Sequence, residues 1–390
     1  MGRGSSISMV QEIMADFADR TGLSPGKAPR RYLWTDAFAV CSFLELYRQT
    51  GNEKYKQAAL RLVDQVHNLL GRHRDDDPRT GWISGLDEEE GKNHPAKGGL
   101  RIGKEMNERG PADPFDENLE WDRDGQYYHY LTKWMHALNR VSEVTGDPKY
   151  NRWAIELAKT AHAKFVYVPP SGGQKRMYWK MSIDLSYPLV QSMGHHDPLD
   201  GFVTYNQLQA TAAKASRKSA RMDLNAEIVD MGHICEGKNW ATDDPLGIGG
   251  LLFDACRVAQ LVVNKDFKQG GLLGVLLDST LVGLESYMRR NPLKIPIDNR
   301  LAFRELGLSI GLRALEKLRG LIEGAPDFFS EAHRLHSGIE AMMRYAPMIE
   351  KNELFWLESV NRMARSWREH QDINIVTLAT SLAPEGFLTL

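Results

Sequence analysis

The hydrophobic positions between Trp34 and Leu70 follow two different helical patterns. Residues 37–46 are apolar except for Ser42 and Glu45, which is typical of a helix buried on most sides. The following stretch has a single apolar stripe, formed by Ala59, Leu62, Val63, Val66, Leu69 and Leu70, which predicts a helix buried on one side. Gly51 and Asn52 lie between them and favour a helix end followed by a helix start. The sequence therefore predicts an inner helix paired with an outer helix.

This pattern recurs along the chain. A helix is expected over 126–144, followed by a turn at 145–150 that resembles the first turn, and then by a one-sided helix. Further helices are expected over 246–263, with a turn at 264–267, over 301–318 and over 328–345. Less regular stretches at 201–215 and 352–367, and a helix at 8–19, supply the remaining members. Repeated helix pairs form either an open solenoid or a closed ring. The irregular spacing, the long loops and the inner helices buried on most sides favour the ring, so the sequence predicts one all-α domain over 1–390, an (α/α)6 toroid of six helical hairpins.

Two segments depart from the helical repeat. Residues 164–168 and 177–183 predict short strands of a hairpin, because Ser171-Gly172-Gly173 lies between them. Residues 72–125 form a long polar insertion after the first hairpin, and a long loop in a compact domain is usually functional. We expect this insertion to be a flap over one end of the ring. The alternative is a solvated surface insertion, which its runs of acidic residues also fit.

Composition narrows the class of protein. A formal net charge of -2 gives no general reason to expect nucleic-acid binding, and the sequence predicts no membrane span. Cys41, Cys235 and Cys256 are far apart and have no metal-ligand spacing, so they are interpreted as reduced thiols of a cytoplasmic protein. The oligomeric state is not predicted.

Polar and aromatic residues gather just before the expected inner helices. In a ring the N-termini of these helices meet at one end, where free N–H groups and the helix dipole favour polar ligands. The candidates for binding a substrate there are Arg31, Trp34, Asp36, Trp121, Gln126, His195, His196, Trp240 and His370. Each aspartate alone is equally explained as a helix cap. Aromatic planes beside carboxylates are what a sugar site requires, so a carbohydrate is the expected ligand.

Other motifs give no cofactor or metal. His195-His196-Asp197 has no partner at a diagnostic spacing, so an active-site loop is a better interpretation than a metal site. Residues 247–250 contain three glycines, but no strand precedes them, so they favour close helix packing over dinucleotide binding. We expect neither a cofactor nor a metal.

The first hairpin resembles a known superfamily. Trp34-Thr35-Asp36-Ala37-Phe38, with the turn at 50–55, is similar to the opening hairpin of six-hairpin glycosidases, and most similar to the unsaturated glucuronyl hydrolases. The turn repeats at 145–150, as it does in those proteins. The resemblance implies an (α/α)6 toroid and a catalytic Asp or Glu at one end of it. Its motifs report the helix pairs more than the chemistry.

A second resemblance is to the N-acylglucosamine 2-epimerases. Gly232-His233-Ile234-Cys235-Glu236 is similar to the Gly-His-x-x-Glu motif of that family, although Gly237 stands where the family has Trp. The resemblance implies that His233 and Glu236 belong to an active site, together with an arginine such as Arg31 and a histidine such as His370.

Three functions follow as hypotheses. A glycoside hydrolase, our first expectation, needs a protonated carboxyl and a second carboxylate, for which the candidates are Asp122, Asp124, Asp197 and Glu236. A sugar epimerase or isomerase needs two bases, for which His233 and His370 are the candidates. A helical binding protein without catalysis is the third.

Overall fold

The computed structural model describes residues 3–215, 223–264, 267 and 271–390. The chain divides into two compact units. Unit 1 contains Met1–Phe17, Arg48–Thr50 and Gly237–Leu390, and unit 2 contains Ala18–Tyr47 and Gly51–Glu236. Each unit is described by itself below.

Unit 2 is built on the helical hairpins that the sequence predicts. Its helices are α2 (Leu33–Thr50, whose last turn belongs to unit 1), α3 (Glu53–Leu70), α4 (Glu88–Asn93), α5 (Glu117–Asp122), α6 (Tyr128–Thr145), α7 (Pro148–Phe165), α8 (Asp197–Ala215) and α9 (Asn225–Cys235). In α2 every residue from Leu33 to Leu46 is buried, whereas α3 buries one face. The inner and outer pattern of the first hairpin is therefore confirmed.

The two predicted turns are confirmed in detail. α2 ends at Gly51, whose φ of 66° is the left-handed conformation that glycine adopts without steric cost. The side chain of Asn52 then caps α3 by accepting a hydrogen bond from the backbone N–H of Lys54. Gly146, at φ 72°, and Asp147 play the same parts between α6 and α7. Local chemistry thus sets both hairpins.

Helices α6 and α8 run parallel to each other. Lys133 in the second turn of α6 bonds Asp200 in the first turn of α8, at 2.7 Å. Further towards the C-terminal end of both helices, Asn139 bonds Thr211 at 2.9 Å. α2 begins beside α6, because the hydroxyls of Tyr32 and Tyr130 lie 2.7 Å apart. The N-terminal ends of α2, α6 and α8 therefore lie together.

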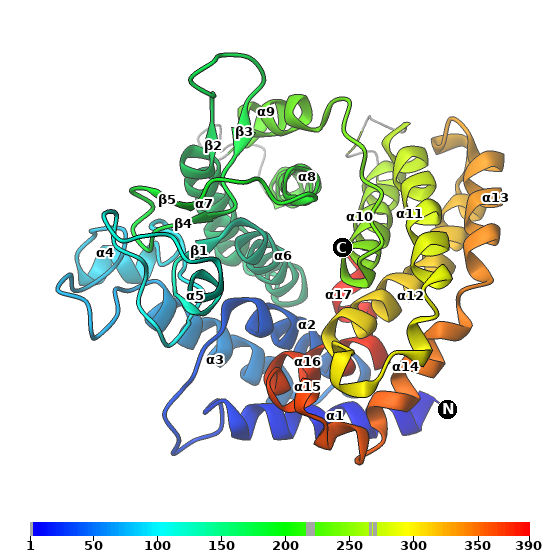
Figure 1. The fold of residues 1–390 in the computed structure, drawn as a ribbon, viewed down its shortest axis with the longest axis horizontal. Helices are drawn as coiled ribbons and strands as arrows, with labels where there is room; N and C mark the ends of the chain where they lie inside the picture. Colours follow the sequence, from blue (N-terminus) through cyan, green and yellow to red (C-terminus); the bar gives the residue numbers. More distant parts are fainter. Residues whose placement is uncertain (1–2, 216–222, 265–266, 268–270) are drawn as a thin grey trace. The chain divides into compact units, whose positions relative to one another are not determined.

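Short strands flank these helices. The strands are β1 (Gln126–Tyr127), β2 (Val166–Tyr167), β3 (Arg176–Met177), β4 (Lys180–Met181) and β5 (Pro188–Val190). β2 and β3 pair antiparallel around the glycine turn, which confirms the predicted hairpin (Figure 1). β4 lies between β1 and β5, pairing antiparallel with each. The second sheet therefore joins the chain just before α6 to the segment before α8.

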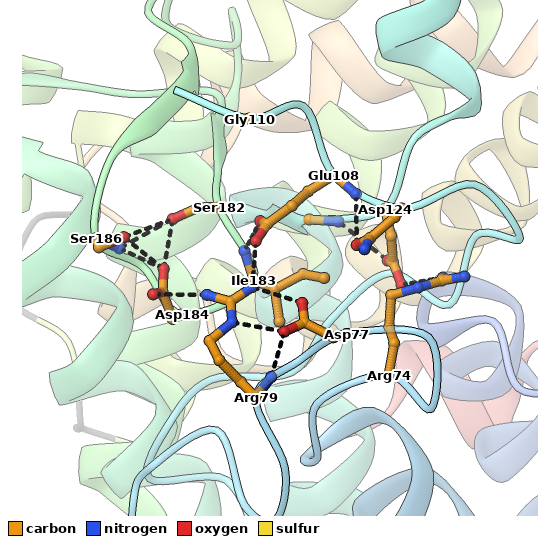
Figure 2. A network of polar contacts seen from close by, with 12 residues as sticks. Arg74, Asp77, Arg79, Glu108, Gly110, Asp124, Ser182, Ile183, Asp184 and Ser186 are labelled. Atoms are coloured by element: carbon orange, nitrogen blue, oxygen red, sulfur yellow. Dashed lines mark hydrogen bonds and ion pairs between the residues drawn. The ribbon is translucent and has the colours of Figure 1, made fainter. Parts of the chain in front are cut away.

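The insertion at 72–125 is tied down by a polar network (Figure 2). Arg79 bonds three carboxylates, those of Asp77, Glu108 and Asp184, at 2.6–2.9 Å. Glu108 also accepts the backbone N–H of Ile183. The insertion is therefore anchored to the turn between β4 and β5. Its role as a flap stays a prediction.

Unit 1 contains the remaining helices. They are most of α1 (Arg3–Arg20), with α10 (Pro245–Val263), α11 (Gly271–Arg289), α12 (Ala302–Gly324), α13 (Ala332–Met343), α14 (Pro347–Leu357), α15 (Arg365–Arg368), α16 (Gln371–Leu382) and α17 (Glu385–Leu388). Single 3-10 turns are η2 (Pro292–Lys294), η3 (Ile297–Asn299), η4 (Pro326–Phe328) and η5 (Asn361–Met363). The helix predicted over 328–345 is shorter, and the one predicted over 352–367 is replaced by α14, η5 and α15.

Glycines let α10 and α12 approach closely. A Cβ on Gly249 would lie 2.2 Å from the carbonyl oxygen of Gly307, and a Cβ on Gly311 would lie 2.6 Å from the Cα of Gly249. Larger residues would push the helices apart. The packing role predicted for the glycines at 247–250 is confirmed for Gly249, whereas a Cβ on Gly250 would meet open space.

α10 is also the one described helix that is long and apolar enough to cross a membrane. Of its apolar window, 78% is buried inside the protein, and it carries a buried ion pair between Asp254 and Arg257. Both features are common in the core helix of a globular protein.

The all-α class and the helical-hairpin repeat are confirmed. Closure into one (α/α)6 toroid domain involves both units and stays a prediction. The turn expected at 264–267 falls partly on Lys265 and Asp266, which lie outside the described residues.

Candidate functional site

The candidate site is formed where α2, α6 and α8 begin. We call it the helix-end site and define it by His129, Lys133, Asp197 and Asp200, together with an aromatic cluster described below. Asp197 is the first residue of α8, and His129 is the second residue of α6. The parallel packing of α6 and α8 brings these first turns together.

Asp197 and His129 face each other but lie too far apart for a hydrogen bond. The Nδ1 atom of His129 lies 3.8 Å from Oδ1 of Asp197. The Asp197 side chain is 8% exposed, and that of His129 is 31% exposed. Neither Oδ2 of Asp197 nor Nδ1 of His129 has a hydrogen-bond partner in the described part of the chain. Buried polar atoms are nearly always bonded in folded proteins, so this pair is a candidate for binding a ligand.

Burial changes the protonation of both groups. It raises the pKa of Asp197 to about 7, and the neighbouring charge of Asp200 raises it further, while Lys133 opposes the rise. Burial also lowers the pKa of His129 to about 3, with a further contribution from Lys133. Near neutral pH the imidazole is therefore uncharged and Asp197 exchanges a proton readily. A neutral base beside a proton-carrying acid is suited to proton transfer.

Aromatic rings pack around His129. The aromatic cluster consists of Tyr32, Trp121, Tyr127, His129, Tyr130 and Trp179. Neighbouring rings in it have centroids 4.8–6.4 Å apart. Trp179 stacks roughly parallel to the His129 ring, and Trp121 is 48% exposed. Such surfaces can pack against the C–H face of a sugar ring.

Asp124, a predicted catalytic residue, is bonded within the protein. Its carboxylate is completely buried and accepts hydrogen bonds from Arg101 at 2.9 Å, Arg74 at 3.2 Å and the backbone N–H groups of Gly103 and Gly125. Two arginines and two amides occupy both oxygens. Asp124 therefore holds the insertion in place and has no lone pair to offer a substrate (Figure 2).

Three predicted binding residues at the start of α2 are also part of the scaffold. Arg31 bonds Asp36 at 3.3 Å and the carbonyl oxygen of Thr21, and Asp36 accepts the backbone N–H of Tyr32. Trp34 is 7% exposed, and its ring packs 4.2 Å from that of Phe38. These side chains fix the first turn of α2, and the role of Arg31, Trp34 and Asp36 as substrate contacts stays a prediction.

Gln126 is likewise structural. It is fully buried, accepts the backbone N–H of Leu100 at 2.8 Å, and donates to the carbonyl oxygens of Gly98 and Ile183. Its amide ties the insertion to β4 and the turn that follows it.

Other predicted residues lie at or near the helix-end site. Trp121 belongs to the aromatic cluster, and Asp122 is exposed beside it at the end of α5. His195 and His196 immediately precede α8, with ring centroids 4.6 Å apart. Asp197 is the predicted carboxylate that the structure brings into the site.

His233 and Glu236 lie at the C-terminal end of α9, where both are exposed. No hydrogen bond or ion pair described in unit 2 joins either side chain to Asp197 or His129. Trp240 and His370 belong to unit 1, where Trp240 is 2% exposed and His370 packs edge-on against Phe303.

Sequence reasoning missed His129, Lys133 and Trp179. His129 and Lys133 are spaced i, i+4 at the start of an inner helix, which places them on one face. That spacing was a usable signal. No local sequence signal marked Trp179, because this residue reaches the site through the pairing of β4 with β1. Among the described residues, no group of three or more His, Cys, Asp or Glu side chains could hold a metal ion.

Comparisons with known proteins find similarity in solved structures alone. No protein-family model matches the chain, and no curated protein sequence matches it. A sugar epimerase from a ruminal bacterium superposes with a TM-score of 0.43 at 10% identity, over 87% of this chain and 98% of that one. The cellobiose 2-epimerase of Spirochaeta thermophila gives 0.44 at 12%, over 88% and 98%, and that of Bacillus thermoamylovorans gives 0.45 at 10%, over 89% and 88%.

All three proteins are named as epimerases, and none of them is named as a glycosidase. Similarity at this level says nothing about the chemistry of the helix-end site, which has to be read from its own residues.

Proposed function

We propose that this chain is a carbohydrate-active enzyme that transfers protons on a sugar, as an epimerase or isomerase does, with Asp197 and His129 as its acid–base pair. The observation that carries this proposal is the unsatisfied pair itself. One buried carboxyl and one neutral imidazole face each other beside aromatic rings.

The chemistry follows from the two protonation states. Neutral His129 removes a proton from the carbon next to the carbonyl group of an open-chain sugar. Protonated Asp197 gives a proton to the carbonyl oxygen, so that the enediol forms without net charge. His129 then gives its proton to the former carbonyl carbon, and the hydroxyl on the neighbouring carbon returns a proton to Asp197, so that the carbonyl group moves by one carbon and the isomer forms. The acid–base pair proposed here replaces the paired histidines His233 and His370.

Hydrolysis is less well supported by the described contacts. It requires a second carboxylate about 5–10 Å from the acid and available to water or to the sugar. Asp200 is bonded to Lys133 and Thr132, and Asp124 is bonded to two arginines. Asp122 is exposed. Hydration of an unsaturated uronide needs one acid–base carboxyl, for which Asp197 is suitable, so it is the second candidate.

The deciding experiment measures deuterium incorporation from D₂O. Aldoses, ketoses and reducing disaccharides are incubated with the enzyme, and NMR follows the C–H signals next to the carbonyl carbon. We expect loss of that signal together with an isomeric product. An increase in reducing ends from oligosaccharides or unsaturated uronides, without exchange at carbon, would overturn the proposal in favour of hydrolysis.

Variants assign the activity to the site. D197N and H129A should lose exchange, whereas H233A should keep it, because His233 is exposed at the end of α9. The reverse result, with H233A inactive and H129A active, would place the chemistry at the Gly-His-x-x-Glu motif instead.

A further inference from the structure

A second acid lies one helical turn beyond Asp197. Asp200 follows it at i, i+3 in α8, so the two carboxyls lie on the same face of the first turn. Oδ2 of Asp200 accepts hydrogen bonds from Lys133 Nζ at 2.7 Å and from the hydroxyl of Thr132. The Asp200 side chain is 7% exposed and that of Lys133 is 16% exposed. Both partners of this ion pair are therefore largely shielded from solvent.

The two acids have opposite surroundings. Asp200 has a cation and a hydroxyl donor, both of which favour its ionised form. Asp197 has an imidazole at 3.8 Å and an oxygen with no partner in the described chain, so nothing equivalent stabilises its ionised form. Two like charges so close together repel each other, and the proton goes to the acid with the poorer partners.

We propose that Asp200, held ionised by Lys133 and Thr132, is a positioning residue that keeps Asp197 protonated and so makes it a proton donor. Asp200 itself needs no contact with the substrate. That Asp197 donates its proton to a substrate rests on the proposed function. The electrostatic coupling between the two acids can be tested without any substrate.

The charged groups around Asp197 agree with this assignment. The titratable groups that interact with Asp197 are Tyr128, His129 and Lys133 of α6 and Asp200 of α8, and Tyr205 of α8 bonds the hydroxyl of Tyr128. His195 and His196 precede Asp197 in the chain. After burial, Asp200 is the group that raises the pKa of Asp197, and Lys133 is the group that lowers it. Burial keeps Tyr128 and Tyr205 uncharged by raising the pKa of each phenol.

The test follows the carboxyl carbon of Asp197 by ¹³C NMR in protein labelled at its aspartate carboxyls, with D197N to assign the signal. In D200N the negative neighbour is gone, and Asp197 should titrate lower by about one pH unit or more. In K133M the acids lose their shared cation, and the step that involves Asp197 should move to higher pH. The conservative D200E should titrate close to the unchanged protein.

A matched control exists on α3. Glu53 also accepts hydrogen bonds from a lysine, Lys56, and a hydroxyl, that of Tyr47, each at 3.0 Å, but far more exposed. E53Q and K56M change the net charge as D200N and K133M do, and they should leave the Asp197 titration unchanged. Equal shifts in both sets of variants would reduce the effect to net charge and overturn the proposal.

The remaining outcomes are separate. An unchanged Asp197 titration in folded D200N overturns the proposal whatever the activity. If D200N does not fold, the direction of the K133M shift decides. If the titrations shift as expected but no sugar exchanges deuterium, the coupling stands and the proposed function fails. If both hold, the fall of activity at high pH should move with the Asp197 titration in each variant.

Discussion

Two groups of buried carboxylates in unit 2 are treated in opposite ways. In the insertion, Asp124 accepts four hydrogen bonds from two arginines and two amides, and Arg79 binds three carboxylates at once (Figure 2). At the helix-end site, Asp197 is also buried but has an oxygen without a partner in the described chain. A carboxylate whose oxygens all accept hydrogen bonds stabilises a structure. A buried carboxylate with an unbonded oxygen costs stability and is available for chemistry.

The comparison predicts that the two aspartates separate activity from stability. D197N should reduce turnover by about 10²- to 10⁴-fold, because general acid catalysis contributes about that much. Its free energy of unfolding at neutral pH should not fall, since Asp197 has few bonds to lose. Steady-state kinetics and urea unfolding of the same preparation measure both. A stable variant with full turnover would remove Asp197 from the mechanism.

D124A should show the opposite behaviour. Removing this carboxylate leaves Arg74 and Arg101 buried without their partner, which typically costs about 3–5 kcal/mol of unfolding free energy. Turnover per folded molecule should stay within a few-fold of the unchanged protein. The midpoint of urea unfolding measures the first quantity. A large loss of turnover with normal stability would instead return Asp124 to the site.

The two regions should also differ in their dependence on pH. The folded protein raises the pKa of Asp197 to about 7, so between the unfolded value near 3.8 and 7 the folded state binds the extra proton. The stability that Asp197 contributes is therefore complete below about pH 4 and is lost as pH rises to 7. Relative to D197N, the unchanged protein should lose unfolding free energy on the order of a few kcal/mol across that window. A constant difference between the two would contradict the raised pKa.

Gly194 offers a way to move the Asp197 carboxyl without removing it. A Cβ on Gly194 would lie 2.4 Å from Oδ2 of Asp197, so Gly194→Ala must displace that carboxyl. We expect a loss of about 10- to 100-fold in kcat, because small misplacements of a catalytic group are costly. G338A, in α13, has open space around its added methyl and no positive φ to strain, and is the control. Unchanged kcat in G194A, or an equal loss in G338A, would contradict the role of the Asp197 carboxyl.

The smallest effect is expected at the edge of the site. Trp121 is 48% exposed and meets Trp179 edge-on, so W121A should raise KM by a few-fold, at about 1 kcal/mol or less, and leave kcat unchanged. Kinetics over a range of sugar concentrations separate the two constants. A change confined to kcat would mean that the indole positions a reacting group.

The sequence determined the first two helical hairpins of unit 2 and the turns inside them. All-round burial predicted α2, and Gly51, Asn52, Gly146 and Asp147 predicted the turns, because these signals act over a few residues of chain. The sequence also placed Asp197 at the start of an inner helix. It ranked a hydrolase first and gave Asp124, Gln126 and Arg31 to the site, since polar residues before a helix look alike whether they bind a ligand or the protein.

The tertiary structure alone decided which acid is available. Arg74 and Arg101 reach Asp124 from 50 and 23 residues away, and Lys133 reaches Asp200 from 67 residues away. No local pattern reports such partners. The availability of a carboxylate depends on whether distant donors fill its lone pairs, and folding brings those donors to Asp124 and Asp200 and leaves Asp197 facing His129.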